Sequence, residues 1–159
     1  MELSLFDVLG PVMIGPSSSH TAGAARLAGV ARQIAGEFVH VSFGLHGSFA
    51  RTYRGHGTDR ALVAGALGLS PQDERLRRAF DLARERGVAF DFYPTHVEGA
   101  HENTVVMTFR SADGRERTIE GASLGGGRIR ICRIDEYPAE ITADAPTLVI
   151  LQQDRQGMV

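Results

Sequence analysis

The first half of the chain alternates between helical and extended patterns of apolar residues. Apolar positions recur at helical spacing over residues 21–36, where a glycine at the end predicts the stop of a helix. Apolar and polar residues then alternate over residues 39–45, a pattern that is typical of a half-buried strand. Two further helices are predicted at residues 60–67 and 70–87, the second with Ser70 as its N-cap.

Strand patterns dominate the second half of the chain. The predicted strands lie at residues 88–92, 104–110, 115–119 and 127–134. An Asp113-Gly114 turn joins the second and third of these strands into a predicted hairpin. Polar stretches predict loops at residues 46–59, 94–103 and 135–140. The whole pattern predicts an α+β fold, in which helices pack against a mixed or antiparallel sheet.

A last apolar strand is predicted at residues 147–151, and the sequence ends soon after it. A strand needs neighbouring strands to satisfy its backbone hydrogen bonds. We therefore expect the 159-residue sequence to be a fragment of a longer chain.

Two features of the composition exclude several kinds of chemistry. All 17 basic residues are arginine, so the chain can supply neither the lysine of a pyridoxal Schiff base nor that of a P-loop. The single cysteine, Cys132, cannot ligate an iron–sulfur cluster or form an internal disulfide. We expect it to be a small packed residue in a protein of the reducing cytoplasm.

The charge distribution indicates a small-molecule ligand. The net charge is −2, and the charged residues are scattered, so we expect binding to neither nucleic acid nor a membrane surface. The N-terminus lacks the basic and apolar regions of a signal peptide, and no apolar stretch is long enough to span a membrane. The histidines lack the paired spacing of a metal site, so no metal ligand is assigned.

Three polar clusters fall where predicted elements meet. In the first, residues 15–21, three serines precede a helix, whose free amides and dipole attract a carboxylate or phosphate. A serine that merely caps the helix is the simpler interpretation. In the second, glycines on both sides of His56 leave its ring uncrowded, so that it can act as an acid or a base near neutral pH. The alternative is a turn histidine that forms a hydrogen bond with Asp59. In the third, His101 and Asn103 bind a ligand together or form an ordinary strand entry.

Four segments together are similar to a known enzyme family. They are SLFDVLGPVMIGPSSSHTAGAARLAG (4–29), LHGSFARTYRGHGTD (45–59), AHEN (100–103) and SLGGG (123–127). In this order they resemble the beta subunit of the iron–sulfur-dependent bacterial L-serine dehydratases, whose first domain is related to an allosteric substrate-binding domain of some phosphoglycerate dehydrogenases. The resemblance implies that residues 1–142 form this domain and that residues 146–159 are the first strand and turn of an ACT domain.

The resemblance also implies an activity, a cofactor and partners. The family converts L-serine to pyruvate and ammonia without pyridoxal phosphate, using a [4Fe–4S] cluster that three cysteines of the alpha subunit hold. It implies His56 and His101 as the acid–base residues of this chain. The residues that it implies for L-serine binding are Ser17, Ser18, Ser19, His20, Thr21 and Asn103. Gly57 stands where some relatives carry a second histidine, which puts a paired-histidine role there in doubt.

Two other functions are compatible with the same residues. The chain could be a regulatory module that binds serine or another small anion without catalysis, in which case it should bind serine in the absence of an alpha subunit. It could also be an oligomerisation scaffold whose strand at residues 147–151 pairs with a second copy. Under the dehydratase hypothesis we expect either an oligomer of beta chains or an alpha–beta assembly.

Overall fold

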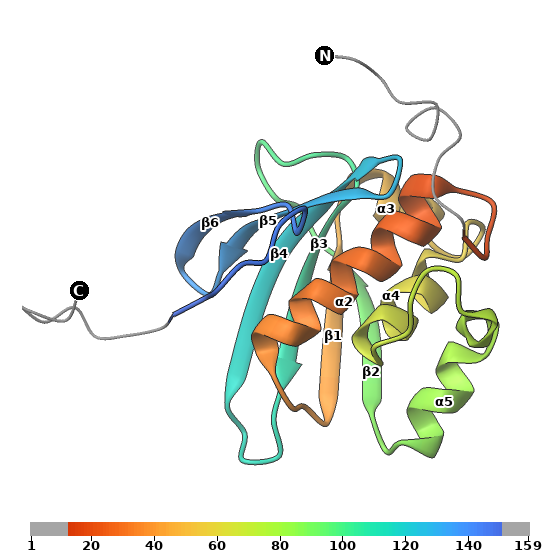
Figure 1. Ribbon diagram of the computed structural model, residues 1–159, viewed down its shortest axis with the longest axis horizontal. Coiled ribbons are helices and arrows are strands. Elements are labelled where there is room, and N and C mark those ends of the chain that lie inside the picture. The colour runs from red at the N-terminus through yellow and green to blue at the C-terminus, as the bar shows by residue number, and fades with distance from the viewer. Residues whose placement is uncertain (1–12, 151–159) are drawn as a thin grey trace, which may run out of the picture.

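A computed structural model of the chain describes residues 13–150 and shows helices packed on one face of a sheet (Figure 1). The sheet has six strands in the described part, in the order β2-β1-β3-β4-β5-β6. The strands are β1 (His40–Leu45), β2 (Ala89–Pro94), β3 (Thr104–Arg110), β4 (Glu116–Gly125), β5 (Arg128–Ile134) and β6 (Tyr137–Ile141). Strands β1 and β2 pair in parallel, and the other neighbours pair antiparallel. The sheet is therefore mixed, which confirms the predicted α+β class.

The helices follow the sequence pattern closely at their ends. They are η1 (Ser18–Gly23), α2 (Ala24–Ala35), α3 (Gly47–Thr52), α4 (Thr58–Ala66), η2 (Glu74–Arg78) and α5 (Ala79–Glu85). The first, η1, is a π-helical turn that continues directly into α2, so the predicted first helix starts three residues earlier than expected. It ends as predicted at Gly36, whose φ of 82° is accessible to glycine without steric cost.

Two predicted elements were placed wrongly because the decisive contacts are not local. The predicted loop at residues 46–59 contains α3, which buries Phe49 completely. The predicted loop at residues 135–140 contains most of β6, which pairs with β5. The turn before β6 is held by Asp135, which accepts a hydrogen bond from the Thr118 amide at 2.8 Å and donates one from its own amide at 2.7 Å.

Two other predictions need correction at the level of single residues. Asp73, not Ser70, caps the helical segment before α5, since its Oδ1 accepts the Arg75 amide at 2.9 Å. That segment starts as a 3₁₀ helix, η2, before becoming α5. Residues 147–150 form no strand, and Leu151, with the rest of the predicted ACT segment, lies outside the described residues.

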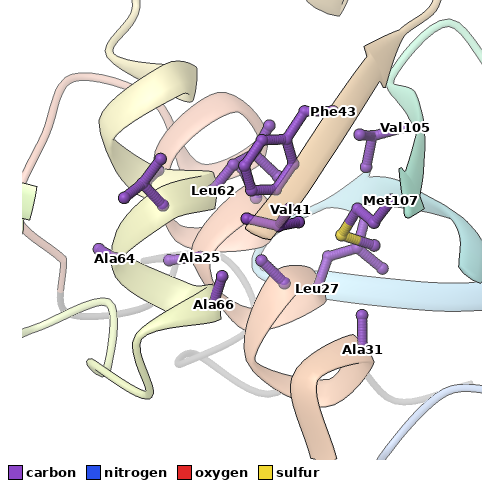
Figure 2. Close-up of a cluster of buried hydrophobic side chains, with 14 of the residues drawn as sticks. Ala25, Leu27, Ala31, Val41, Phe43, Leu62, Ala64, Ala66, Val105 and Met107 are labelled. Atoms are coloured by element: carbon purple, nitrogen blue, oxygen red, sulfur yellow. The ribbon is translucent and has the colours of Figure 1, made fainter. Parts of the chain in front are cut away.

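Small residues bring α2 very close to α4 on the covered face of the sheet. Figure 2 shows Ala25 and Leu27 of α2, Leu62 of α4, and Val41 and Phe43 of β1 gathered in one cluster of buried side chains. A Cβ atom on Gly65 of α4 would lie only 2.1 Å from the carbonyl oxygen of Ala25. The two helices therefore touch backbone to backbone, and any added carbon at Gly65 would force them apart.

The opposite face of the sheet is polar. The first four residues of β1 alternate: Val41 and Phe43 are buried under the helices, while His40 and Ser42 both bond to Asp91 of β2 at 2.8 Å. This is the usual division for a sheet that helices cover on one side only. Among the described residues, no helix is long and apolar enough to cross a bilayer.

The contact between α2 and α4 predicts opposite effects for two glycine substitutions. Gly65→Ala should lower the free energy of unfolding by about 1–3 kcal/mol, because the new carbon overpacks the contact. Gly29→Ala on α2 is the matched control. Its Cβ would meet the Gly65 carbonyl oxygen at an ordinary 3.7 Å, so higher helix propensity should leave stability unchanged or raise it by up to about 1 kcal/mol. Urea unfolding measures both, and equal losses would contradict the contact.

Candidate functional site

The turn that opens the first helix is fixed at both ends. Ser17 is the N-cap, and its Oγ accepts the His20 amide at 3.1 Å. Ser123 of β4 donates its hydroxyl to the Ser19 carbonyl oxygen at 2.9 Å. A Cβ on Gly23 would lie 2.0 Å from the Ser123 Oγ, so glycine is what allows β4 to approach. The capping role that we considered for these serines is thus present, at Ser17.

His20 is buried at the centre of this turn, with a hydroxyl group near each ring nitrogen. Its Nδ1 lies 3.2 Å from the Ser19 Oγ and 3.4 Å from the Ser17 Oγ. Its Nε2 lies 3.2 Å from the Oγ of Ser48, in α3. A neutral imidazole donates from one nitrogen and accepts at the other, and hydroxyls can serve either role. These contacts hold the ring in place without fixing its tautomer.

His56 lies against the edge of the His20 ring. The two ring centroids are 4.9 Å apart with the ring planes at 82°, and Phe49 flanks His20 from another direction at 5.2 Å. His56 is exposed, in the turn between α3 and α4, and its carbonyl oxygen accepts the Thr21 hydroxyl at 3.2 Å. The structure thus unites two histidines that are far apart in the sequence.

Asp59 does not bind His56. Its Oδ1 accepts the Arg60 amide at 2.8 Å inside the first turn of α4, and no hydrogen bond joins it to His56 within the described residues. The alternative in which Asp59 holds His56 is therefore not seen.

The third cluster, residues 101–103, contacts the other residues of the site through backbone hydrogen bonds. The Glu102 carbonyl oxygen accepts the Ser48 amide at 2.7 Å, and the Asn103 carbonyl oxygen accepts the Ser123 amide at 3.0 Å. The Asn103 Oδ1 is buried without a hydrogen-bond partner among the described residues. His101 is exposed, its Nδ1 accepts the Asn103 amide at 3.1 Å, and no described contact links it to His20 or His56.

Two residues of the site were not identified from the sequence. Ser48 contacts the His20 ring, and Ser123 anchors the serine turn, but both stood in segments that showed only loop or strand character. A hydroxyl in either segment is unremarkable until the sheet brings it to residues 17–21. Recognising α3 as a helix would have placed Ser48 in its first turn.

Burial shifts the pKa values of two groups here in opposite senses. Removal from water lowers the pKa of His20, and the neighbouring His56 lowers it further. Removal from water raises the pKa of Asp59, an effect that its backbone hydrogen bond and the charges of Arg60 and Arg54 oppose. His20 is therefore neutral at pH 7, where it can accept a proton.

The chain's own residues do not fit an iron–sulfur cluster. Its one cysteine, Cys132, is half-buried in β5, and burial raises the pKa of the thiol above its ordinary value. Thiolates, not thiols, ligate iron. Within residues 13–150, no three His, Cys, Asp or Glu side chains are grouped so that they could hold a metal ion.

Several known proteins are similar in sequence to this chain over most of its length. The model of the family described as serine dehydratase beta chain matches residues 4–132. A protein named L-serine dehydratase, beta chain, from Peptoniphilus asaccharolyticus is 41% identical, over 99% of this chain and 72% of its own. The probable L-serine dehydratase beta chain of Bacillus subtilis is also 41% identical, over 98% of this chain and 71% of its own. An L-serine dehydratase of Mycobacterium tuberculosis is 33% identical over 81% of this chain and 33% of its own.

The lowered pKa of His20 predicts a specific dependence of stability on pH. Below the ordinary value of 6.5, the unfolded chain binds a proton at this residue more readily than the folded chain does. The contribution of His20 to stability is therefore complete above about pH 6.5 and is lost as the pH falls toward the lowered folded value. Urea unfolding between about pH 7 and pH 5 should show a shallower fall in stability for His20→Gln than for the parent. The exposed His101→Gln serves as control, and an unchanged pH dependence in His20→Gln would contradict the shift.

Proposed function

The chain belongs to the serine dehydratase beta-chain family, and from this we propose that its His20–His56 pair completes the active site of an L-serine dehydratase. The observation that carries the proposal is the edge contact between a buried histidine and an exposed one, 4.9 Å apart, at the end of a serine-rich turn. A second chain that covers this surface would enclose a substrate against both rings.

The reaction sets the tasks of the site. Conversion of L-serine to pyruvate and ammonia begins with loss of the Cα proton and the β-hydroxyl as water, which leaves aminoacrylate; its imine tautomer then hydrolyses. In the family that the sequence resembles, a [4Fe–4S] cluster of the alpha chain supplies a Lewis acid for the departing hydroxyl. Because this chain cannot hold that cluster, its share of the reaction is to bind the amino acid and to transfer protons.

Histidine is suited to proton transfer near neutral pH. Of the two acid–base residues proposed from the sequence, His56 has the stronger geometric support, since its exposed ring is in T-shaped contact with the buried ring of His20. His101 remains part of the proposal, but its Nδ1 is engaged by the Asn103 amide, which leaves only its Nε2 for a substrate. We assign the proton-accepting role to the His20–His56 pair as a unit.

The polar groups around the pair divide into those that shape the site and those left for the substrate. Ser17 caps the turn, and the Thr21 hydroxyl is bound to the His56 carbonyl oxygen. Ser18 and Asn103 have polar side chains with no hydrogen bond to another described residue. We therefore propose Ser18 and Asn103, with Ser19 and the amides of the first turn, as the groups that bind the L-serine carboxylate.

Histidine substitutions test the proposal in the complete enzyme. With the alpha chain reconstituted, His56→Ala should lower kcat about 100- to 10,000-fold, the usual contribution of a general acid or base. His20→Ala should have an effect of similar size. His101→Ala tests whether His101 is the other acid–base residue, as proposed from the sequence. His40→Ala is the matched control, since that ring lies on the opposite face of the sheet, bound to Asp91.

Two outcomes would count against this function. Near-normal turnover in both His20→Ala and His56→Ala would remove the catalytic role of the pair. Tight binding of L-serine to the isolated chain by calorimetry, together with unaffected turnover in the variants, would instead favour the regulatory module.

A further inference from the structure

A cavity of about 350 Å³ adjoins the histidine pair and has His56 in its wall; it lies between the start of the described chain, the 54–57 turn and η2. Its lining residues are Ile14, Gly15, Pro16, Thr21, Arg54, Gly55, His56, Gly57, Arg60, Leu76 and Arg77. Its volume is within the range of small-molecule sites. Three arginines, from three different segments, supply all the permanent charge of this lining.

Within residues 13–150, Arg54, Arg60 and Arg77 form no ion pair with an acidic side chain. The ion pairs of the described residues use other arginines throughout, such as Arg51 with Glu102 and Arg75 with Asp73. Asp59 is close enough to Arg54 and Arg60 for their charges to act on its pKa, but its carboxylate accepts the Arg60 amide and is almost completely buried. The lining therefore carries three positive charges and no acidic residue.

Two of the guanidinium groups are supported by aromatic rings. Arg60 lies over the Phe80 ring at 5.6 Å, and Arg54 lies over the Tyr53 ring at 5.4 Å. Such cation–π contacts restrict the side chain and leave the N–H edges of the guanidinium free to donate. Three donors held around one cavity match the oxygen atoms of a carboxylate or phosphate.

We propose that this cavity binds a small oxyanion, a carboxylate or a phosphate, through Arg54, Arg60 and Arg77. Thr21 and His56 line the same cavity, so a bound anion would lie directly against the residues of the proposed active site. Binding itself requires only this chain. Its consequence for turnover, by contrast, rests on the proposed function.

Nuclear magnetic resonance on the full chain tests binding without any assay of turnover. Titration with inorganic phosphate at pH 7 should shift the Gly55 and Gly57 amide signals and the His56 ring signals, with saturation in the millimolar range. The His40 ring, on the opposite face of the sheet, should not respond. Higher salt should weaken the interaction.

Substitutions identify the donors. Arg54→Gln and Arg77→Gln should each weaken phosphate binding about five- to tenfold, as expected for loss of one charge-assisted contact. Arg130→Gln, an exposed arginine of β5 outside the cavity, is the matched control and should change binding less than about twofold. All three side chains are exposed, so the variants should keep the parent spectrum elsewhere.

Two further titrations distinguish the sources of the oxyanion. Malonate should displace phosphate if the site accepts carboxylates. Displacement by L-serine would identify the substrate carboxylate as the occupant, whereas phosphate binding without displacement would identify a separate effector. Absence of shifts around His56, or equal weakening in Arg130→Gln, would overturn the site while leaving the histidine assignment intact.

Discussion

The contact between the backbones of α2 and α4 determines where the two histidines of the site lie. His20 belongs to the turn that opens α2, and His56 lies two residues before the start of α4. Because Gly65 has no side chain, its backbone can pack directly against the Ala25 carbonyl oxygen, where a Cβ atom would lie only 2.1 Å away. At the other end of α4, the Thr21 hydroxyl joins the two segments directly by donating to the His56 carbonyl oxygen at 3.2 Å. Helix packing and this hydrogen bond together hold the segments whose imidazole centroids lie 4.9 Å apart.

The sheet provides the second support. Its β4 strand anchors the serine turn through Ser123, and the backbone that leads into β3 binds both Ser123 and Ser48. The site therefore forms where the ends of two helices, one short helix and two strands converge. Residues 17–21 are consecutive, but the other residues of the site come from distant parts of the chain, and each is positioned by an element that packs on the apolar core.

Sequence reasoning identified the elements that local pattern governs and missed those that depend on distant contacts. The alternation in β1 and the Asp113-Gly114 turn are readable because periodicity and turn chemistry are local. The short helix α3 is not readable in this way, since its stability depends on burying Phe49 beneath other elements. For the same reason His20 and His56 could be singled out separately, but their contact required the three-dimensional structure.

The close approach of Gly23 to Ser123 constrains how the sequence can change over evolution. Any side chain at position 23 would displace the Ser123 hydroxyl, which in turn holds the Ser19 carbonyl oxygen. A larger residue at either position is tolerable only if the other is altered with it. Two sites at opposite ends of the domain sequence are therefore expected to vary as a pair, so that divergence in one is a signature of a remodelled serine turn.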